Sequence, residues 1–265
     1  MGKLKLNRIC KLIDVSTSKT KSVADQFATD LGYAIVKYNA MSTPATVSKS
    51  YKPSSLHCIR NMYYQCVEAD IDSPTESPES VGIGESGTDR HLRIQNYICH
   101  MKEHGVDCEY VDVATYIKEN NITDLEVLSQ EQFETKLYSS KYNLRFLADG
   151  IIKYRDKYYI LEIKTESSYK WLQRKGVDPS HYYQAYTYSL CFGINSVMFL
   201  YENRDCCTKK CYELQVSDDN RQFIIDRLND CNSYVQSKIV PPKPTDIEKK
   251  VCQYCGYKKT CRGDK

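Results

Sequence analysis

The sequence predicts an α/β fold. Two observations support this prediction. First, segments with the apolar spacing of helices lie before and after a group of β-type runs. Second, one more β-type run lies between the last two helical segments. The predicted order is a helix, three strands, a helix, a strand and a helix. With 265 residues, the chain is long enough for one sizeable core and a small accessory lobe.

The bulk composition is that of an ordinary globular protein, with 41% hydrophobic and 27% charged residues. No run approaches the roughly 18 apolar residues of a membrane span. No apolar run of signal-peptide length follows Met1–Lys5. We therefore expect a soluble, cytoplasmic protein. The net charge of +3 permits nucleic-acid binding without requiring it.

The first 53 residues are predicted to form an N-terminal appendage and a linker. Ser22–Leu31 has the pattern of a short helix, and Ala40–Pro53 is polar and contains prolines. Leu56–Ala69 is helical in pattern and runs into an acidic, proline-containing segment, Asp70–Glu79, which is typical of a loop.

The first core element is a predicted helix, Glu85–His104, which Gly105 ends. Ile94, Ile98 and Met101 recur at helical spacing and predict one buried face.

Three β-type runs follow this helix, namely Glu109–Ala114, Leu144–Tyr154 and Tyr158–Lys164, with a turn at Arg155–Lys157. A further run, Phe133–Tyr138, has weaker support as a strand.

The next predicted helix begins at Asp178-Pro179, where Asp is a favourable N-cap and Pro a favourable first residue. Gly193 ends it. A strand at Val197–Glu202 and a helix at Asp219–Lys238 complete the core, and a proline-rich connector leads to the tail.

The hairpin between the last two runs places two acids together. If the turn is centred between Arg155 and Asp156, Asp149 lies opposite Glu162, with Cβ atoms about 4.5–5.5 Å apart. Lys164 then shares a face with Glu162. Two carboxylates this close need a proton or a cation, and oxygen ligands suit Mg²⁺ or Mn²⁺.

A surface hairpin with an acid pair and a salt-bridging lysine produces the same pattern. The apolar residues on either side of Glu162 favour a buried site instead. On the following helix, Gln184 and Tyr188 stand at i and i+4 and share one face.

In this order, Gly87-x3-His91, Asp149-Gly150, Glu162-Ile163-Lys164 and Gln184-x3-Tyr188 resemble the motif set of RecB-type nucleases, which belong to the PD-(D/E)xK superfamily. The resemblance implies a restriction-endonuclease-like αβββαβ core with a mixed central sheet.

The resemblance also implies the roles of the site residues. His91, Asp149, Glu162 and the carbonyl of Ile163 would bind Mg²⁺ or Mn²⁺, and Lys164 would be the catalytic lysine. Gln184 and Tyr188 would contact DNA or support that lysine. By itself, a helical histidine such as His91 is more often a packed or solvent-facing residue than a ligand.

The cysteines form a second candidate site. The tail carries Cys252-x2-Cys255-x5-Cys261, which leaves a four-coordinate metal site one ligand short. Cys58 is the preferred fourth ligand and Cys66 the alternative. Cys206-Cys207-x3-Cys211 is either a second site or, as we favour, a loop without a ligand.

One distant upstream cysteine with three at the C-terminus resembles the iron–sulfur branch of these nucleases, in particular the CRISPR-associated RecB-like exonuclease family. The resemblance implies a [4Fe–4S] cluster held by Cys58, Cys252, Cys255 and Cys261, with Zn²⁺ as the alternative. The domains would then be residues 54–245, the nuclease core, and residues 246–265, a cysteine segment packed with the Cys58 region.

These features predict a metal-dependent DNA nuclease, in particular an exonuclease that acts on single strands or ends and serves recombination, CRISPR adaptation or phage DNA metabolism. A bacterial, archaeal or phage-encoded protein fits this prediction. The expected partners are DNA and either a partner protein or further copies of the chain, with no membrane. The alternative is a catalytically silent DNA-binding or assembly subunit with the same fold.

A basic stretch, Lys170–Lys175, either contacts the nucleic-acid strand or is a solvated loop.

Overall fold

The computed structural model describes residues 22–42, 49–72, 77–245, 252 and 255–263. The chain divides into two compact units. The smaller comprises residues 1–45 and 75–83, and the larger comprises residues 46–74 and 84–265. In the part of the chain that the structure describes, no helix is both long and apolar enough to span a bilayer.

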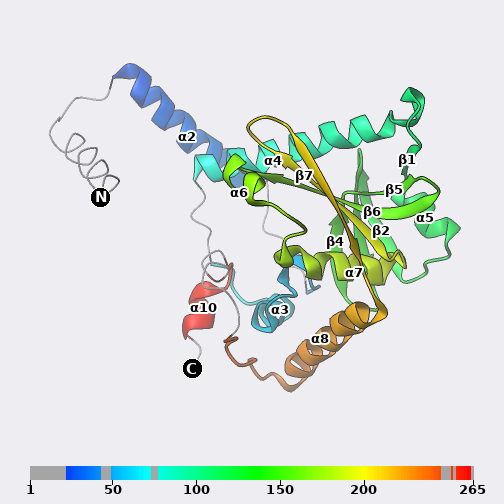
Figure 1. Cartoon of the computed structure of the whole chain (residues 1–265). Coiled ribbons are helices and arrows are strands. Elements are labelled where there is room, and N and C mark those ends of the chain that lie inside the picture. The colour runs from blue at the N-terminus through cyan, green and yellow to red at the C-terminus, as the bar shows by residue number, and fades with distance from the viewer. Residues whose placement is uncertain (1–21, 43–48, 73–76, 246–251, 253–254, 264–265) are drawn as a thin grey trace. The chain divides into compact units, whose positions relative to one another are not determined.

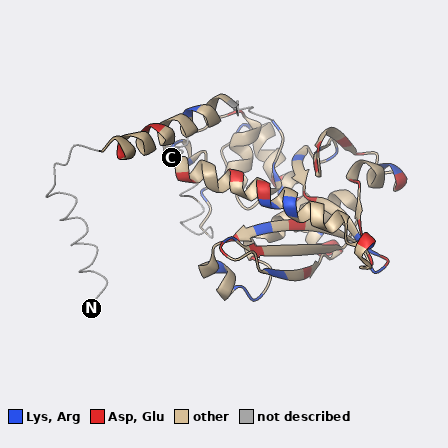
Figure 2. Cartoon of the chain, turned by 90° about the horizontal axis from the view of Figure 1, so that it is seen from above, with Lys and Arg blue, Asp and Glu red and all other residues tan. Residues whose placement is uncertain are grey.

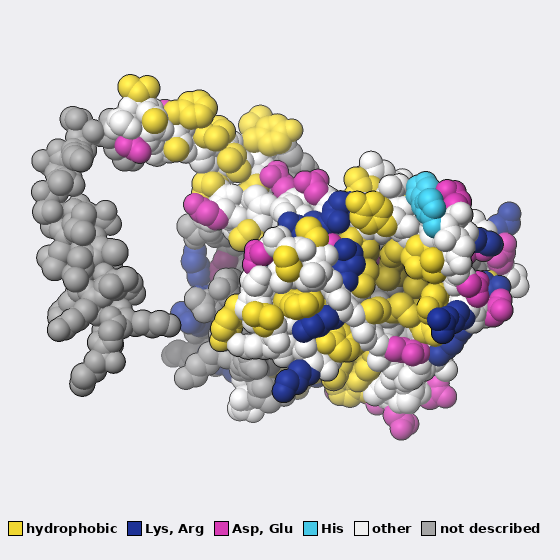
Figure 3. Space-filling view, turned by 45° about the horizontal axis from the view of Figure 1, so that its top comes forward, with side chains coloured by type: hydrophobic (Ala, Val, Ile, Leu, Met, Phe, Trp, Pro, Cys, Tyr) yellow, Lys and Arg dark blue, Asp and Glu magenta, His cyan; other side chains and the backbone are white. Residues whose placement is uncertain are grey.

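The smaller unit contains helix α2 (Val23–Ser42). Apolar side chains lie exposed along it, and Figure 3 shows them as a run of yellow groups. The predicted helix at Ser22–Leu31 was therefore placed correctly but too short.

The larger unit is organised around a five-stranded sheet in the order β1-β5-β6-β7-β8 (Figure 1). The β6–β7 pair is parallel and the other pairs are antiparallel, which confirms a mixed α/β architecture. The strands are β1 (Cys108–Val111), β5 (Gly150–Tyr154), β6 (Lys157–Glu166), β7 (Ser196–Asn203) and β8 (Lys209–Gln215).

Helices lie on both faces of this sheet. Ile94 and Ile98 of α4 pack on Leu161 and Ile163 of β6 on one face, in a cluster completed by residues of β1 and β5. The larger cluster includes residues of α7 and α8 together with Ile151, Ile160 and Val197. The helices are α3 (Ile59–Cys66), α4 (Pro78–Cys99, of which residues 84–99 belong to this unit), α5 (Val113–Glu119), α6 (Ser168–Gln173), α7 (Tyr182–Phe192), α8 (Asp218–Ser237) and α10 (Lys258–Gly263), with short 3₁₀ turns at Pro53–Ser55, Lys102–His104 and Pro179–His181.

A second sheet has three strands in the order β2-β3-β4, namely β2 (Leu125–Glu131), β3 (Glu134–Ser139) and β4 (Leu144–Ala148). The single run predicted at Leu144–Tyr154 is wrong. It divides at Asp149 into β4 and β5, which belong to different sheets, so Asp149 lies where the two sheets part.

The predicted hairpin register is confirmed. Tyr154 faces Lys157 and Gly150 faces Leu161, with Arg155 and Asp156 in left-handed backbone conformations that close a two-residue turn. Gly193 ends α7 in a left-handed conformation, as predicted. Gly105 is also left-handed, but it ends the 3₁₀ turn Lys102–His104, whereas the α-helix predicted to reach His104 ends at Cys99.

The prediction that Glu109–Ala114 is one strand is wrong at its end. Asp112 caps α5 by accepting the Thr115 N–H at 2.8 Å, so Val113 and Ala114 are helical. An aspartate ahead of a short helical segment is the signal for this cap. The sequence analysis also missed β2 and β8, whose strands have an exposed face.

Charges of both signs are interspersed along the chain (Figure 2). Individual side chains in the pockets of the larger unit therefore say more about function than the overall charge does.

Candidate metal and nucleic-acid site

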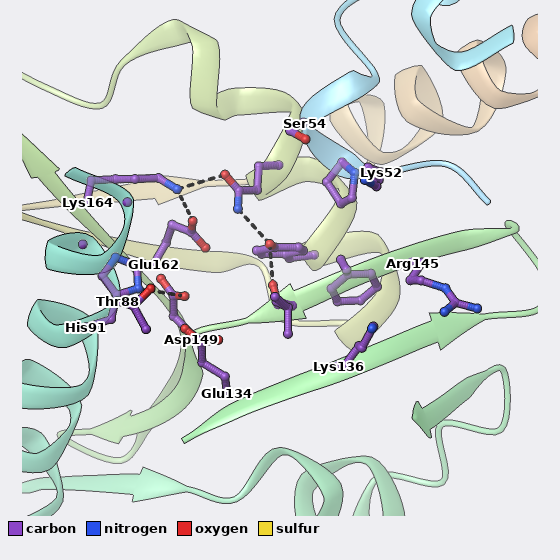
Figure 4. A pocket seen from close by; sticks show the side chains of 17 residues that line it. Lys52, Ser54, Thr88, His91, Glu134, Lys136, Arg145, Asp149, Glu162 and Lys164 are labelled. Carbon is purple, nitrogen blue, oxygen red and sulfur yellow. Dashed lines mark hydrogen bonds and ion pairs between the residues drawn. The ribbon is translucent and has the colours of Figure 1, made fainter. Parts of the chain in front are cut away.

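The acids of the hairpin line an open cavity of about 660 Å³ in the larger unit. Figure 4 shows its labelled side chains, with Glu162, Asp149 and Glu134 between His91 and Lys164 on one side and a group of cations on the other. The cavity is lined by residues of α4, of the strands and of α7, among them Lys52, Gly84, Gly87, His91, Glu134, Lys136, Arg145, Leu147, Asp149, Glu162, Lys164, Gln184 and Tyr188.

Asp149 is held by hydrogen bonds from three elements. Its Oδ2 accepts the Ile163 N–H of β6 at 2.7 Å. Its backbone carbonyl accepts the Gln95 amide of α4 at 2.6 Å and lies 2.9 Å from the Tyr110 hydroxyl of β1. That hydroxyl also lies 2.8 Å from the Phe133 carbonyl. Strand, helix and neighbouring strand thus position this carboxylate together.

Gly150 allows this close approach. Its φ of +153° is rare for an L side chain, and a Cβ there would come within 2.6 Å of the Tyr110 ring. A side chain at position 150 would therefore push Tyr110 away from the Asp149 carbonyl.

Glu162 is 2% exposed and contacts the Lys164 ammonium. Burial raises the pKa of Glu162 and the Asp149 charge raises it further, while Lys164 opposes the shift. Its Oε2 is a buried oxygen with no hydrogen-bond partner among the described residues. An unpaired buried carboxylate oxygen is costly unless a cation or proton occupies it.

His91 of α4 and Glu134 of β3 complete the acidic group. The His91 Nδ1 lies 3.4 Å from Asp149 Oδ1. One ligand atom from each of His91, Glu134 and Asp149 lies within 4.8 Å of the others. Burial opposes the charged form of His91, but Asp149 outweighs it and raises the pKa of His91. Burial and Asp149 also raise the pKa of Glu134.

Lys164 is linked to the following helix by a chain of contacts. Its Nζ donates to Gln184 Oε1 at 3.2 Å, the Gln184 amide donates to the Tyr188 hydroxyl at 2.8 Å, and that hydroxyl donates to the Leu147 carbonyl at 2.8 Å. Burial opposes the Lys164 charge, but Glu162 and Asp149 outweigh it and raise the pKa of Lys164. The lysine is therefore a fixed cation beside the acids.

These residues fit a divalent cation. Carboxylate oxygens and an imidazole suit Mg²⁺ or Mn²⁺, and the unpaired Glu162 Oε2 lies among them. The predicted ligands His91 and Asp149 lie in the close group. Glu162 lines the same cavity but lies outside that group, and Glu134 takes its place there.

The sequence analysis missed Glu134 as a candidate ligand. Ser139 faces Leu144 across the β3–β4 turn, and this register extends to Glu134 beside Asp149. Asn143, which adopts a left-handed conformation, was the available signal for that turn. Gln95 and Tyr110 were missed because their contacts with Asp149 are long-range.

The cysteines line a different pocket, of about 280 Å³. Its walls include Cys58, Cys252, Cys255 and Cys261. Burial raises the pKa of Cys58 and of Cys255. Thiols are ligands of iron–sulfur clusters and of Zn²⁺, and these four cysteines line one pocket, but among the described residues no three of their sulfurs lie within 4.8 Å of one another.

Arg60 joins the two parts of the chain that form this cysteine pocket. Its guanidinium donates to the Pro241 carbonyl at 3.1 Å, to the Tyr64 hydroxyl at 2.6 Å and to the Cys261 carbonyl at 3.4 Å. The segment after Cys58 is thus attached to the tail.

The alternative cysteines lie elsewhere. Cys66 donates to the Lys49 carbonyl at 3.2 Å and does not line the cysteine pocket. Cys206, Cys207 and Cys211 belong to the exposed β7–β8 hairpin, and Arg90 approaches Cys207 Sγ to 3.7 Å.

The basic stretch after β6 is partly engaged in internal contacts. Arg174 binds Glu166 at 2.7 Å and Asp178 at 3.0 Å, and the Lys210 ammonium lies 4.0 Å from the centre of the Trp171 ring. Arg174 and Trp171 therefore stabilise the segment itself.

No protein-family model matches the sequence, and no curated protein matches it. By structure the chain is similar to SSO0001, with a TM-score of 0.48 and 18% identity over 86% of this chain and 94% of that one. It is also similar to LHK-Exo, an alkaline exonuclease from Laribacter hongkongensis, with a TM-score of 0.43 and 13% identity over 72% and 89%. The complex of LHK-Exo with dAMP gives a TM-score of 0.42 and 13% identity over 72% and 90%.

Proposed function

We propose that the chain is a metal-dependent nuclease that hydrolyses phosphodiester bonds in DNA, acts as a single-strand exonuclease, and has a restriction-endonuclease-like αβββαβ core. One observation carries the proposal: a buried Glu162–Lys164 pair shares a cavity with the close group of His91, Glu134 and Asp149. The element order α4-β1-β5-β6-α7-β7, with α5 and β2–β4 inserted after β1, supports the core.

The metal ligands would be His91, Asp149, Glu162 and the Ile163 carbonyl, with Glu134 as an additional candidate. A bound Mg²⁺ or Mn²⁺ supplies Lewis-acid polarisation of a phosphoryl oxygen and lowers the pKa of water.

The protein supplies orientation and charge. The Lys164 ammonium, which Gln184 and Glu162 hold in place, donates hydrogen bonds to an attacking water or to a non-bridging phosphoryl oxygen as negative charge develops there. The Tyr188 hydroxyl accepts a hydrogen bond from the Gln184 amide and donates one to the Leu147 carbonyl. It thereby holds Gln184 in place and limits the positions that Lys164 occupies.

We also propose that Cys58, Cys252, Cys255 and Cys261 hold a [4Fe–4S] cluster, with Zn²⁺ as the alternative. The cluster would act as a structural link between the α3 segment and the tail. Iron and sulfide quantification after anaerobic purification separates the two: a brown protein with iron and sulfide supports the cluster, and a colourless protein with zinc supports the alternative.

The test of the nuclease is cleavage of single-stranded oligonucleotides labelled at the 5′ or the 3′ end, in the presence of Mn²⁺. We expect cleavage by the wild type and its loss in Glu162→Ala and Lys164→Ala. Glu126→Ala and Lys153→Ala, which change the same residue types outside the pocket, serve as matched controls. Binding without cleavage of DNA or RNA under any divalent metal would contradict the nuclease and favour the silent binding subunit.

A further inference from the structure

One face of the β3–β4 pair extends from the acidic group along the cavity. Lys136 faces Leu147 and Tyr138 faces Arg145 across the two strands. Because side chains alternate along a strand, these residues share a face with Glu134, while the intervening residues are buried. The pair therefore presents two acids at one end and then one cation on each strand.

Lys136 and Arg145 of this face, and Lys52 beside it in the same cavity, form no ion pair with an acid in the described structure. Among the described residues, no carboxylate lies within ion-pair distance of Lys52, Lys136 or Arg145, although all three line the cavity. The Arg145 Nε is buried without a hydrogen-bond partner in the described structure. Figure 4 shows the three cations together on the side of the acids away from Lys164.

Two glycines of α4, Gly84 and Gly87, also line the cavity. A Cβ at either position would meet nothing within 4 Å. Packing therefore does not require glycine at these positions, and their small size leaves room for a ligand beside the helix.

We propose that Lys136, Arg145 and Lys52 form a binding track for the phosphate backbone of an unpaired nucleic-acid strand that leads away from the acidic site. This inference rests on the proposed nuclease function and adds the path of the strand. Lys136 and Arg145 lie on neighbouring strands at ladder positions two residues apart, which is about 7 Å along the strand direction, and Lys52 lines the same cavity. The three cations could therefore contact successive phosphates of an extended backbone. Leu147, 50% exposed between them, offers an apolar contact to a sugar or base.

The size of the cavity favours an unpaired strand. A volume of about 660 Å³ is that of a pocket for one small ligand, so a short piece of one strand fits inside it, whereas a whole duplex does not. The phosphate backbone common to DNA and RNA provides the recognised charge, and parallel DNA and RNA probes distinguish the two.

The test is fluorescence anisotropy of a labelled single-stranded oligodeoxynucleotide in EDTA, which prevents cleavage. We compare the wild type with Lys52→Gln and with the double variant Lys136→Gln/Arg145→Gln. The double variant Lys153→Gln/Arg155→Gln is the matched control, because it removes the same charges at the β5–β6 turn outside the cavity. Circular dichroism and thermal melting verify that each variant is folded.

We expect severalfold weaker binding in each track variant and no change in the control. In the Lys136/Arg145 variant, the slope of log affinity against log salt should become shallower by about 1.4, since each phosphate contact contributes about 0.7 for single strands. A blunt duplex should bind more weakly than the single strand.

Wild-type affinity and salt slope in the Lys136/Arg145 variant would overturn the track. An equal loss in the control variant, or equal affinity for duplex and single strand, would overturn it too. Cleavage is scored separately: a wild type that cuts nothing while the track variants still lose binding refutes the nuclease and leaves the track standing.

Discussion

The acidic pocket and the cysteine pocket are assembled in different ways. In the acidic pocket, strand register and hydrogen bonds position each key side chain: Asp149 is held from three elements, and Lys164 is held through Gln184 and Tyr188. The cysteine pocket joins segments at the two ends of the larger unit's sequence, where Cys58 precedes α3 and Cys261 lies in α10.

The two pockets therefore differ in how much their structure depends on a bound metal or cluster. The scaffold of the acidic pocket is complete without a metal, apart from the buried Glu162 oxygen. At the cysteine pocket, the described residues join the α3 side to the tail through a few contacts. Arg60 donates to the Cys261 carbonyl, and the Asn61 amide lies 3.6 Å from Cys255 Sγ. Asp72 donates its N–H to the Gly256 carbonyl and accepts the Lys259 N–H, each at 2.7 Å. We therefore expect metal loss to impair chemistry at the first site and stability at the second.

The largest effect should come from the cysteine pocket. Cys255→Ser should reduce bound iron to background and destabilise the protein by roughly 4 kcal/mol or more, because loss of a structural metal is among the most damaging changes. Iron analysis and thermal denaturation measure this. Cys66→Ser, outside the pocket, should retain its iron; equal losses in both variants would remove the distinction between these two cysteines.

At the acidic pocket, Lys164→Ala should reduce kcat by about 10²–10³-fold, the cost of removing one preorganised donor to a developing negative charge. The thermal transition should change little, which contrasts with the cysteine variant. Initial rates on a labelled single strand measure the effect. A variant with wild-type kcat would exclude Lys164 from the chemistry.

Gln95 and Tyr110 test whether the scaffold itself sets the metal site. Gln95→Leu or Tyr110→Phe should weaken Mn²⁺ binding by about 10–100-fold, because each removes a contact that positions Asp149. Isothermal titration calorimetry provides the affinity. Tyr154→Phe, a tyrosine outside the cavity, is the matched control, and equal affinities in Tyr110→Phe and this control would show that Asp149 needs no such support.

The smallest effect concerns the stability of the metal-free acidic pocket. The raised pKa of Glu162 means that the folded state binds a proton more tightly than the unfolded state. Its contribution to stability is therefore full below the ordinary glutamate pKa of about 4.3 and is lost as pH rises through the folded pKa.

Glu162→Gln removes this penalty. In EDTA at pH 8 we expect its Tm to exceed that of the wild type by roughly 2–4 °C, equivalent to about 1 kcal/mol for a chain of this size. The difference should shrink toward pH 5. A lower Tm for the variant at pH 8 would contradict the raised pKa.

The sequence predicted those parts of the molecule that depend on local pattern. The Arg155–Asp156 turn fixed the register of β5 and β6, and the alternation of side chains along β6 put Glu162 and Lys164 on one face. Gly193 ended its helix as expected, while Gly105 ended only the 3₁₀ turn that follows α4.

The remaining features depend on tertiary contacts. The Asp149-Gly150 pair is the one local signal of the break inside the apolar run, but the contacts that hold Asp149 there come from distant elements, because Tyr110 and Gln95 bind its carbonyl. Glu134 reaches the acidic group only through the β3–β4 register. Strand β8, with alternate exposed residues, carries too weak an apolar pattern to be recognised.

The most direct test of the central claim is an anomalous difference map from crystals of the protein soaked in Mn²⁺. The proposed metal site predicts a manganese peak in the acidic pocket, with His91, Asp149 and Glu162 among its ligands. In Asp149→Ala crystals soaked in the same way, the peak should be lost or strongly reduced. Manganese bound elsewhere with this pocket empty, or a peak unchanged in Asp149→Ala, would contradict it.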